Sequence, residues 1–175
     1  MARLIPILVL LVAFAGLTQA QEALGKEIKD RDIEWSDFSG PVDPASRFDA
    51  VTNWAIPYRY SAPVMRGDRV YVNATTQTFL RANSWVKPNK QSDRLLDHER
   101  GHFKIGRICA REIAATINST GFDPSTYREE INKVYWAVLR KYLEIEKQYD
   151  EETDHYRDRE LQARWNKKLD ELLSK

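Results

Sequence analysis

Cysteine is almost absent from this sequence, and neither sign of charge dominates it. The single cysteine, Cys109, has no partner for an internal disulfide. Lysine and arginine number 27 against 26 aspartates and glutamates, which gives a formal charge of +1. This balance does not indicate a basic surface that would bind nucleic acid or an anionic membrane. Internal repeats and low-complexity segments are also lacking. With 175 residues, 42% of them hydrophobic, the chain fits one ordinary globular domain.

Long hydrophobic runs are scarce too, and the longest lies at the N-terminus. Ile5 to Leu17 covers about 13 residues, against the ~20 that a membrane-spanning helix needs. Arg3 precedes this run, and Thr18-Gln19-Ala20 follows it with small residues where signal peptidase cleaves. This layout predicts a signal peptide over residues 1–20 and a secreted or periplasmic protein with no stable membrane span after cleavage. The alternative is an uncleaved N-terminal anchor.

Residues 21–33 are mostly polar and are expected to form a lead-in, which places the domain at residues 34–175. In residues 34–90, prolines and glycines separate short β-rich runs, which favours a small antiparallel sheet. The runs cover residues 56–60, 69–80 and 84–86. Arg66-Gly67-Asp68 predicts a turn before the second run and so indicates a hairpin.

The pattern becomes helical from Ser92 onward. Apolar and histidine side chains recur every three or four residues and predict a helix that ends near Gly121. Asp123 followed by Pro124 predicts the start of a second long helix, and residues 150–154 are expected to connect it to a shorter third one. The predicted strands come first along the chain and the predicted helices follow them. This order predicts an α+β fold, with a small N-terminal antiparallel sheet packed on three C-terminal helices.

One motif on the first predicted helix indicates chemistry: His98-Glu99-Arg100-Gly101-His102. Residues four apart lie on one helical face, so the imidazoles of His98 and His102 can reach one metal ion. Glu99 lies at the edge of that face, where its carboxylate can act as general base on the attacking water. The pattern alone is not specific, because two histidines at this spacing also occur as ordinary surface or core residues. Here it lies inside a periodic helix and holds two of the chain's three histidines.

A catalytic zinc ion usually has three protein ligands and one open position. His155, the third histidine, is the first candidate for the missing ligand, and it is expected at the start of the last helix. Carboxylates also bind zinc, so Asp150, Glu152 and Asp154 compete with it.

Several blocks of the sequence resemble those of a known family. Residues 95–103, Leu-Leu-Asp-His-Glu-Arg-Gly-His-Phe, resemble the core motif of a bacterial family catalogued as a domain of unknown function and described as predicted secreted zinc-dependent proteases. Residues 35–40, 84–86 and 149–155 resemble its other blocks, so the resemblance covers roughly residues 33–165.

The resemblance implies a zincin-like arrangement, in which an extended substrate adds to an edge strand above the metal helix. It implies that His98, His102 and His155 hold Zn²⁺ and that Glu99 is the catalytic acid/base. Tyr156 departs from the family pattern, which has glycine after the third histidine.

Three further residues are candidates for supporting roles. Asp150 could accept the free N–H of a ligating histidine. Tyr149 or Tyr156 could donate a hydrogen bond to the oxyanion of a tetrahedral intermediate, and simple packing is the alternative for both.

The sequence therefore favours a zinc peptidase that acts on a peptide or protein in the cell envelope or outside it. Two alternatives stay open. One is a metal-stabilised, non-catalytic binding or assembly module of the cell envelope, and the other is a metal-free interaction domain.

Overall fold

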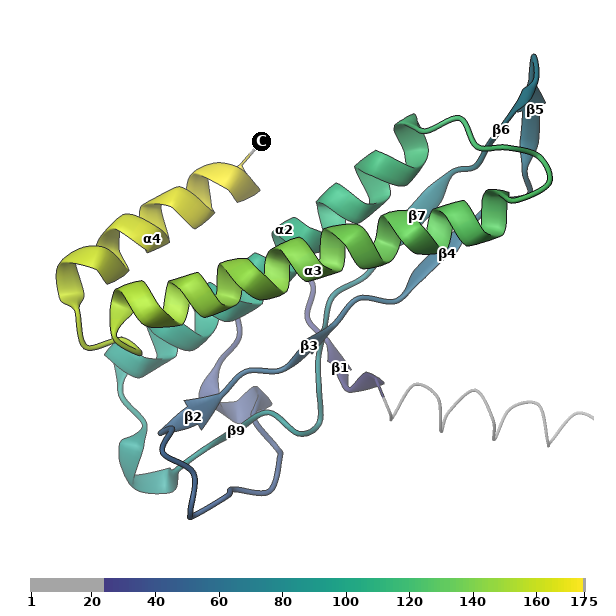
Figure 1. Ribbon diagram of the computed structural model, residues 1–175. Helices are drawn as coiled ribbons and strands as arrows, with labels where there is room; N and C mark the ends of the chain where they lie inside the picture. The colour runs from purple at the N-terminus through teal and green to yellow at the C-terminus, as the bar shows by residue number, and fades with distance from the viewer. Residues whose placement is uncertain (1–23, 175) are drawn as a thin grey trace, which may run out of the picture.

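The computed structural model describes residues 24–174, in which an antiparallel sheet region precedes three helices. The helices are α2 (Asp93–Ser119), α3 (Tyr127–Thr153) and α4 (Arg159–Leu173). α2 is the central element, because it packs against α3, α4 and strand β7 (Ala74–Thr76). Figure 1 shows the long α2–α3 pair with the strands along one side and α4 at the end away from the β5–β6 tip. The predicted α+β architecture is confirmed.

Most of the strands form one long antiparallel ribbon. Its first arm holds β2 (Ala50–Val51), β3 (Trp54–Ala55), β4 (Tyr58–Tyr60) and β5 (Val64–Arg66). These pair in order with β9 (Trp85–Val86), β8 (Phe79–Leu80), β7 and β6 (Arg69–Tyr71). At the tip, Arg66 pairs with Arg69 across a two-residue turn, in which Gly67 has the positive φ of 64° that glycine adopts readily. The predicted hairpin is present, and the single run predicted over residues 69–80 is three short strands.

The segment before residue 34 is part of the folded domain. β1 (Lys26–Glu27) pairs with β8 as the third strand of that sheet, and Ile28 and Ile33 are buried in the main core. Residues 24–33 therefore do not form the separate lead-in that their polarity suggested, because two apolar side chains among them suffice to anchor the segment. The predicted signal peptide, residues 1–20, lies outside the described residues. Between residues 24 and 174, no helix has both the length and the apolar character needed to cross a membrane.

The helix ends follow local capping chemistry. Ser92 is the N-cap of α2, since its hydroxyl accepts a hydrogen bond from the Leu95 N–H. The predicted N-cap of the second helix is wrong: Asp123 accepts the Ser125 N–H in a preceding turn, and α3 starts three residues later, after its N-cap Thr126. α3 also continues to Thr153, so residues 150–153 are helical and not a connection.

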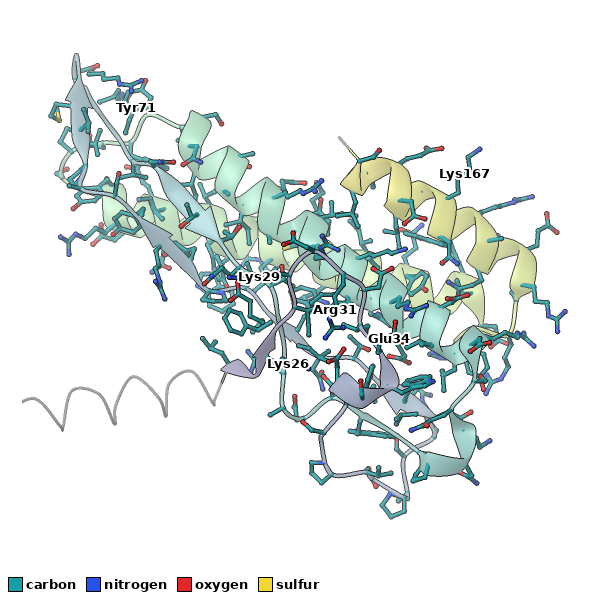
Figure 2. All side chains as sticks on the ribbon, turned by 180° about the vertical axis from the view of Figure 1, so that it is seen from behind. Lys26, Lys29, Arg31, Glu34, Tyr71 and Lys167 are labelled. Carbon is teal, nitrogen blue, oxygen red and sulfur yellow. The ribbon has the colours of Figure 1, made fainter. Side chains whose placement is uncertain are left out.

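A buried carboxylate holds the N-terminal segment together. Asp37 is only 6% exposed and accepts hydrogen bonds from both Arg31 Nη1 and Nη2 at 2.8 Å, from Lys26 Nζ, and from the Glu34 N–H at 2.9 Å. Figure 2 shows Lys26, Arg31 and Glu34 on neighbouring parts of this segment. The hydrogen bonds from Arg31 keep the pKa of Asp37 well below its usual range, which outweighs the opposing effect of burial.

Asp37→Asn is expected to lower the free energy of unfolding by about 1–3 kcal/mol at pH 7, because charge-assisted bonds are lost in a buried site. Since the folded-state pKa is depressed, this contribution is present above about pH 4 and is lost as the pH falls further. The difference in the free energy of unfolding between wild type and variant, measured by urea titration, should therefore be smaller at pH 3 than at pH 7. Asp68→Asn, in the exposed β5–β6 turn, is the control. A difference that stays constant with pH would contradict the ionic role.

Candidate metal centre

Facing sides of α2 and α3 bring three metal-ligating atoms together. His98 and His102 lie one turn apart on α2, and their Nε2 atoms are 3.3 Å from each other. Asp150 comes from α3, and its Oδ1 lies 3.1 Å from each of those nitrogens. The three atoms thus form a nearly equilateral triangle between the helices. The sequence analysis put His155 first for this position and kept Asp150 as a competing ligand; the structure brings the Asp150 oxygen to the third corner of the triangle.

His155 approaches the same point from the turn between α3 and α4, not from the start of the last helix. Its Nδ1 is 3.3 Å from Asp150 Oδ1, and donor atoms of His98, Asp150 and His155 all lie within 4.8 Å of one another. The imidazole is about one-third exposed and packs edge-on against Phe48. His155 therefore joins the cluster, in which it contacts the carboxylate of Asp150.

The other two competing acids point elsewhere. Glu152 accepts the Trp165 Nε1–H at 2.7 Å, and Asp154 is mostly exposed and pairs with Arg157 at 3.5 Å. Neither carboxylate belongs to the cluster, although both lie within three residues of His155 in sequence.

Second contacts orient the two α2 imidazoles. The Nδ1 of His98 donates to Gln162 Oε1 at 3.1 Å, and the Nδ1 of His102 donates to Glu146 Oε1 at 3.2 Å. With its Nδ1 protonated, each ring presents an Nε2 lone pair to the point that they share. Glu146 is itself fixed by the Trp54 Nε1–H, 2.6 Å from the same oxygen. The sequence analysis missed both partners. The available signals were Glu146 one helical turn before Asp150, and Gln162 at helical spacing from Trp165 on the buried side of α4.

Tyr149 supports His98 from behind. Its ring stacks on the imidazole at 4.7 Å between centroids, and its hydroxyl donates to the His98 carbonyl and accepts from Gln162 Nε2. The side chain is fully buried, and this burial raises the pKa of Tyr149. A hydroxyl with these partners has no hydrogen bond left for an oxyanion, so the geometry favours the packing alternative for Tyr149. The neighbouring Gly101 makes this contact possible, because any side chain there would overlap the Tyr149 hydroxyl.

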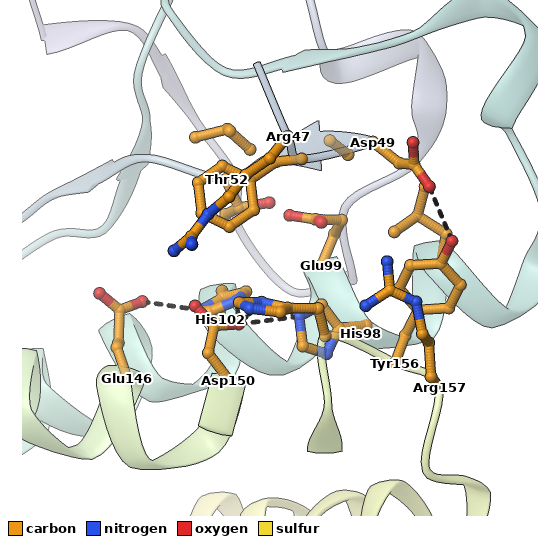
Figure 3. Close-up of a pocket in the computed structure, with 15 residues that line it drawn as sticks. Arg47, Asp49, Thr52, His98, Glu99, His102, Glu146, Asp150, Tyr156 and Arg157 are labelled. Atoms are coloured by element: carbon orange, nitrogen blue, oxygen red, sulfur yellow. Dashed lines mark hydrogen bonds and ion pairs between the residues drawn. The ribbon is translucent and has the colours of Figure 1, made fainter. Parts of the chain in front are cut away.

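The cluster opens onto a cavity of about 390 Å³. Residues 47–52 form one wall, and α2, α3 and the α3–α4 turn form the rest. Glu99 projects into this space from α2; in Figure 3 it lies on the opposite side of the imidazoles from Asp150 and Glu146. It is 3% exposed, and its Oε2 is buried with no hydrogen-bond partner among residues 24–174. A buried carboxylate oxygen without a partner is costly, which is typical of a functional site.

Tyr156 ties the two walls of the cavity together. Its hydroxyl donates to Asp49 Oδ2 at 2.8 Å, and Figure 3 shows this bond spanning from the α3–α4 turn to the segment before β2. Tyr156 has a φ of 75°, in the region that favours glycine, and it ends a run of three such residues after Asp154 (45°) and His155 (50°). A tyrosine at this position therefore costs backbone strain. Its ring packs against Ala50, Val86 and Leu95, and this contact offsets part of that cost.

The electrostatics of the cluster favour a positive charge at its centre. Burial alone would lower the pKa of His102, but hydrogen bonds to Asp150 and Glu146 raise it well above its usual range. Burial would raise the pKa of Asp150, yet its bonds with His102 and His98 hold it well below normal. A proton or a divalent cation satisfies this arrangement, so the two compete for the site.

Comparison with known proteins gives one match. No curated protein and no solved structure is detectably similar to the chain. The family model described as "Bacterial protein of unknown function (DUF922)" matches residues 25–156, which contain His98, Glu99, His102, Asp150 and His155. The match begins one residue before β1 and ends at Tyr156. The chain therefore belongs to the DUF922 family.

Proposed function

We propose that this protein is an exported zinc-dependent peptidase, which hydrolyses a peptide or amide bond in the cell envelope or outside it. One observation carries the proposal: two imidazole nitrogens and a carboxylate oxygen form a triangle with sides of 3.1, 3.1 and 3.3 Å, beside a cavity that holds the buried Glu99. Export is the part of the proposal that depends on residues 1–20.

The donor set fits zinc. With Zn–N and Zn–O bonds of about 2.0–2.1 Å, the ligand atoms of a tetrahedral site lie about 3.3 Å apart, close to the observed sides. His98, His102 and Asp150 would hold the ion, and His155 is the further nitrogen within reach. The outward hydrogen bonds from both Nδ1 atoms are those expected of zinc-ligating histidines.

The chemistry then follows from the neighbours of the ion. Zinc bound there would supply a Lewis acid, which would lower the pKa of a water molecule towards neutrality. Glu99 accepts the proton of the attacking water and returns it to the leaving amine. Its carboxylate is available for this, since Oε2 forms no hydrogen bond in residues 24–174. Residues 47–52 form the wall along which a substrate would lie.

Metal analysis tests the site. Protein dialysed against zinc is expected to hold about one ion per chain and to cleave peptides in a chelator-sensitive way. Asp150→Asn and His155→Ala should each weaken zinc binding, and Asp150→Asn should do so by more than the roughly 10–100-fold typical of losing an outer-sphere partner. Glu152→Gln is the matched control, because that acid bonds Trp165 away from the cluster. Unchanged zinc affinity in Asp150→Asn would remove Asp150 from the ligand set.

His155 supports a second candidate function. If it binds as a fourth ligand beside His98, His102 and Asp150, no position is left for water and the ion is structural. The protein would then be a metal-stabilised binding or assembly module. In that case chelation lowers the melting temperature, no peptide is cut, and a cobalt-substituted sample keeps a tetrahedral visible spectrum when peptides are added.

A further inference from the structure

The walls of the cavity carry two guanidinium groups on either side of Glu99. Arg47 comes from the segment before β2, and Arg157 lies in the α3–α4 turn. Figure 3 shows their head groups on opposite sides of the Glu99 carboxylate. They originate in segments far apart in sequence, so no local pattern pairs them.

Three of the four acids that line this cavity are engaged by other partners. Asp49 accepts from Tyr156 and pairs with Lys90 at 3.4 Å. Glu146 is bonded to Trp54 and His102. Asp150 contacts the imidazoles, and Glu99 makes no ion pair within the described residues. The carboxylates of the cavity therefore leave its two arginines without strong partners.

Arg47 is the less restrained of the two. Between residues 24 and 174 it makes no ion pair, and its guanidinium lies 4.9 Å from the centroid of the Phe48 ring. Among the residues that the structure describes, Arg157 forms an ion pair only with Asp154, at 3.5 Å, and both side chains are more than half exposed, so this pair is weak. An arginine held over an aromatic ring at the rim of a cavity is suited to bind a carboxylate with two parallel hydrogen bonds.

We propose, building on the peptidase function above, that the site selects peptides with a carboxylate next to the scissile bond, and that Arg47 binds it. The carboxylate is either an aspartate or glutamate side chain or the free C-terminus of the peptide. Arg157, on the opposite wall, adds positive potential and disfavours lysine and arginine in the same position.

Matched peptide pairs test this on the zinc-loaded protein. One pair differs only by glutamate or glutamine beside the scissile bond, and the other only by a C-terminal acid or amide. A charge-assisted bond predicts that kcat/KM is about ten- to a hundredfold higher for the carboxylate member of at least one pair. Preference within the first pair assigns a side chain, and preference within the second assigns a chain terminus.

Arg47→Ala should bring the ratio of kcat/KM between the two members of the preferred pair close to unity. Arg47→Glu should shift the preference to lysine-containing peptides. Arg140→Ala, which removes an exposed guanidinium from α3, should keep the wild-type ratio. Dissociation constants of the same peptide pairs, carrying a fluorescent label, are measured on Glu99→Gln protein. Because this variant is expected not to cleave them, the ratio of these constants reports binding alone.

The outcomes distinguish this inference from the function on which it builds. If all peptides are cleaved at equal rates, or if Arg47→Ala keeps the wild-type preference for carboxylate peptides, the carboxylate pocket is overturned. The proposal that the protein is a peptidase then still stands. If no peptide is cleaved, the peptidase fails, and the dissociation constants alone decide: equal values within each pair overturn the role of Arg47.

Discussion

Glu99→Gln is expected to lower kcat/KM for peptide hydrolysis by about 10²–10⁴-fold while zinc stays bound, because an amide cannot accept the proton of the attacking water. The side chain keeps its shape, and Glu99 is not one of the proposed ligands. Steady-state kinetics and elemental analysis on the same preparations check both parts. Asp97→Asn is the matched control: it removes an exposed acid from the same helix, whose Oδ1 accepts a long hydrogen bond of 3.4 Å from Arg100.

The stability of this variant gives an independent readout. Oε2 of Glu99 is buried without a partner in the described part of the chain, and a buried unpaired charge costs more than a buried amide. The metal-free variant should therefore melt at a higher temperature than metal-free wild type, as expected where a site trades stability for activity. A variant that melts lower and loses zinc would instead assign Glu99 a structural role. One that cleaves at the wild-type rate would exclude it as the general base.

Gly101→Ala is expected to destabilise the protein by roughly 3 kcal/mol, the upper end of the usual cost of overpacking. In an unhindered helix the same change would stabilise by about 1 kcal/mol, because alanine is the better helix former. The difference in sign comes from Tyr149, whose hydroxyl occupies the space of the new methyl group. The ring cannot easily move away, since it is packed between His98 and Trp165.

The same change should weaken zinc binding, because Tyr149 stacks on His98 and fixes its carbonyl. Denaturant unfolding with and without chelator measures both effects. Tyr149→Phe removes the atom nearest the new methyl group, so the double variant should recover part of the loss in a double-mutant cycle. A Gly101→Ala protein more stable than wild type would mean that α2 and α3 do not meet as closely as the structure places them.

Interactions within one element could be predicted from the sequence. The spacing of His98 and His102 places both on one face of a helix whatever the rest of the fold does, and Ser92 caps that helix through a bond three residues long. The β5–β6 turn at Gly67 is local in the same sense, and it sets the register of the long ribbon. Burial of Cys109 also follows from its place in the helical pattern.

Contacts between elements were decided by the tertiary structure. Asp150, Glu146 and Gln162 reach the two histidines only because α3 and α4 cross α2 at particular positions, and no periodicity records that crossing. Because α3 extends to Thr153, Asp150 lies on the helix and His155 lies in a turn with left-handed backbone. Lys26 and Glu27 joined the sheet as β1 because β8 has an edge to pair with. The physical reason is the same in each case: sequence spacing determines which side chains share a face, and packing determines what that face meets.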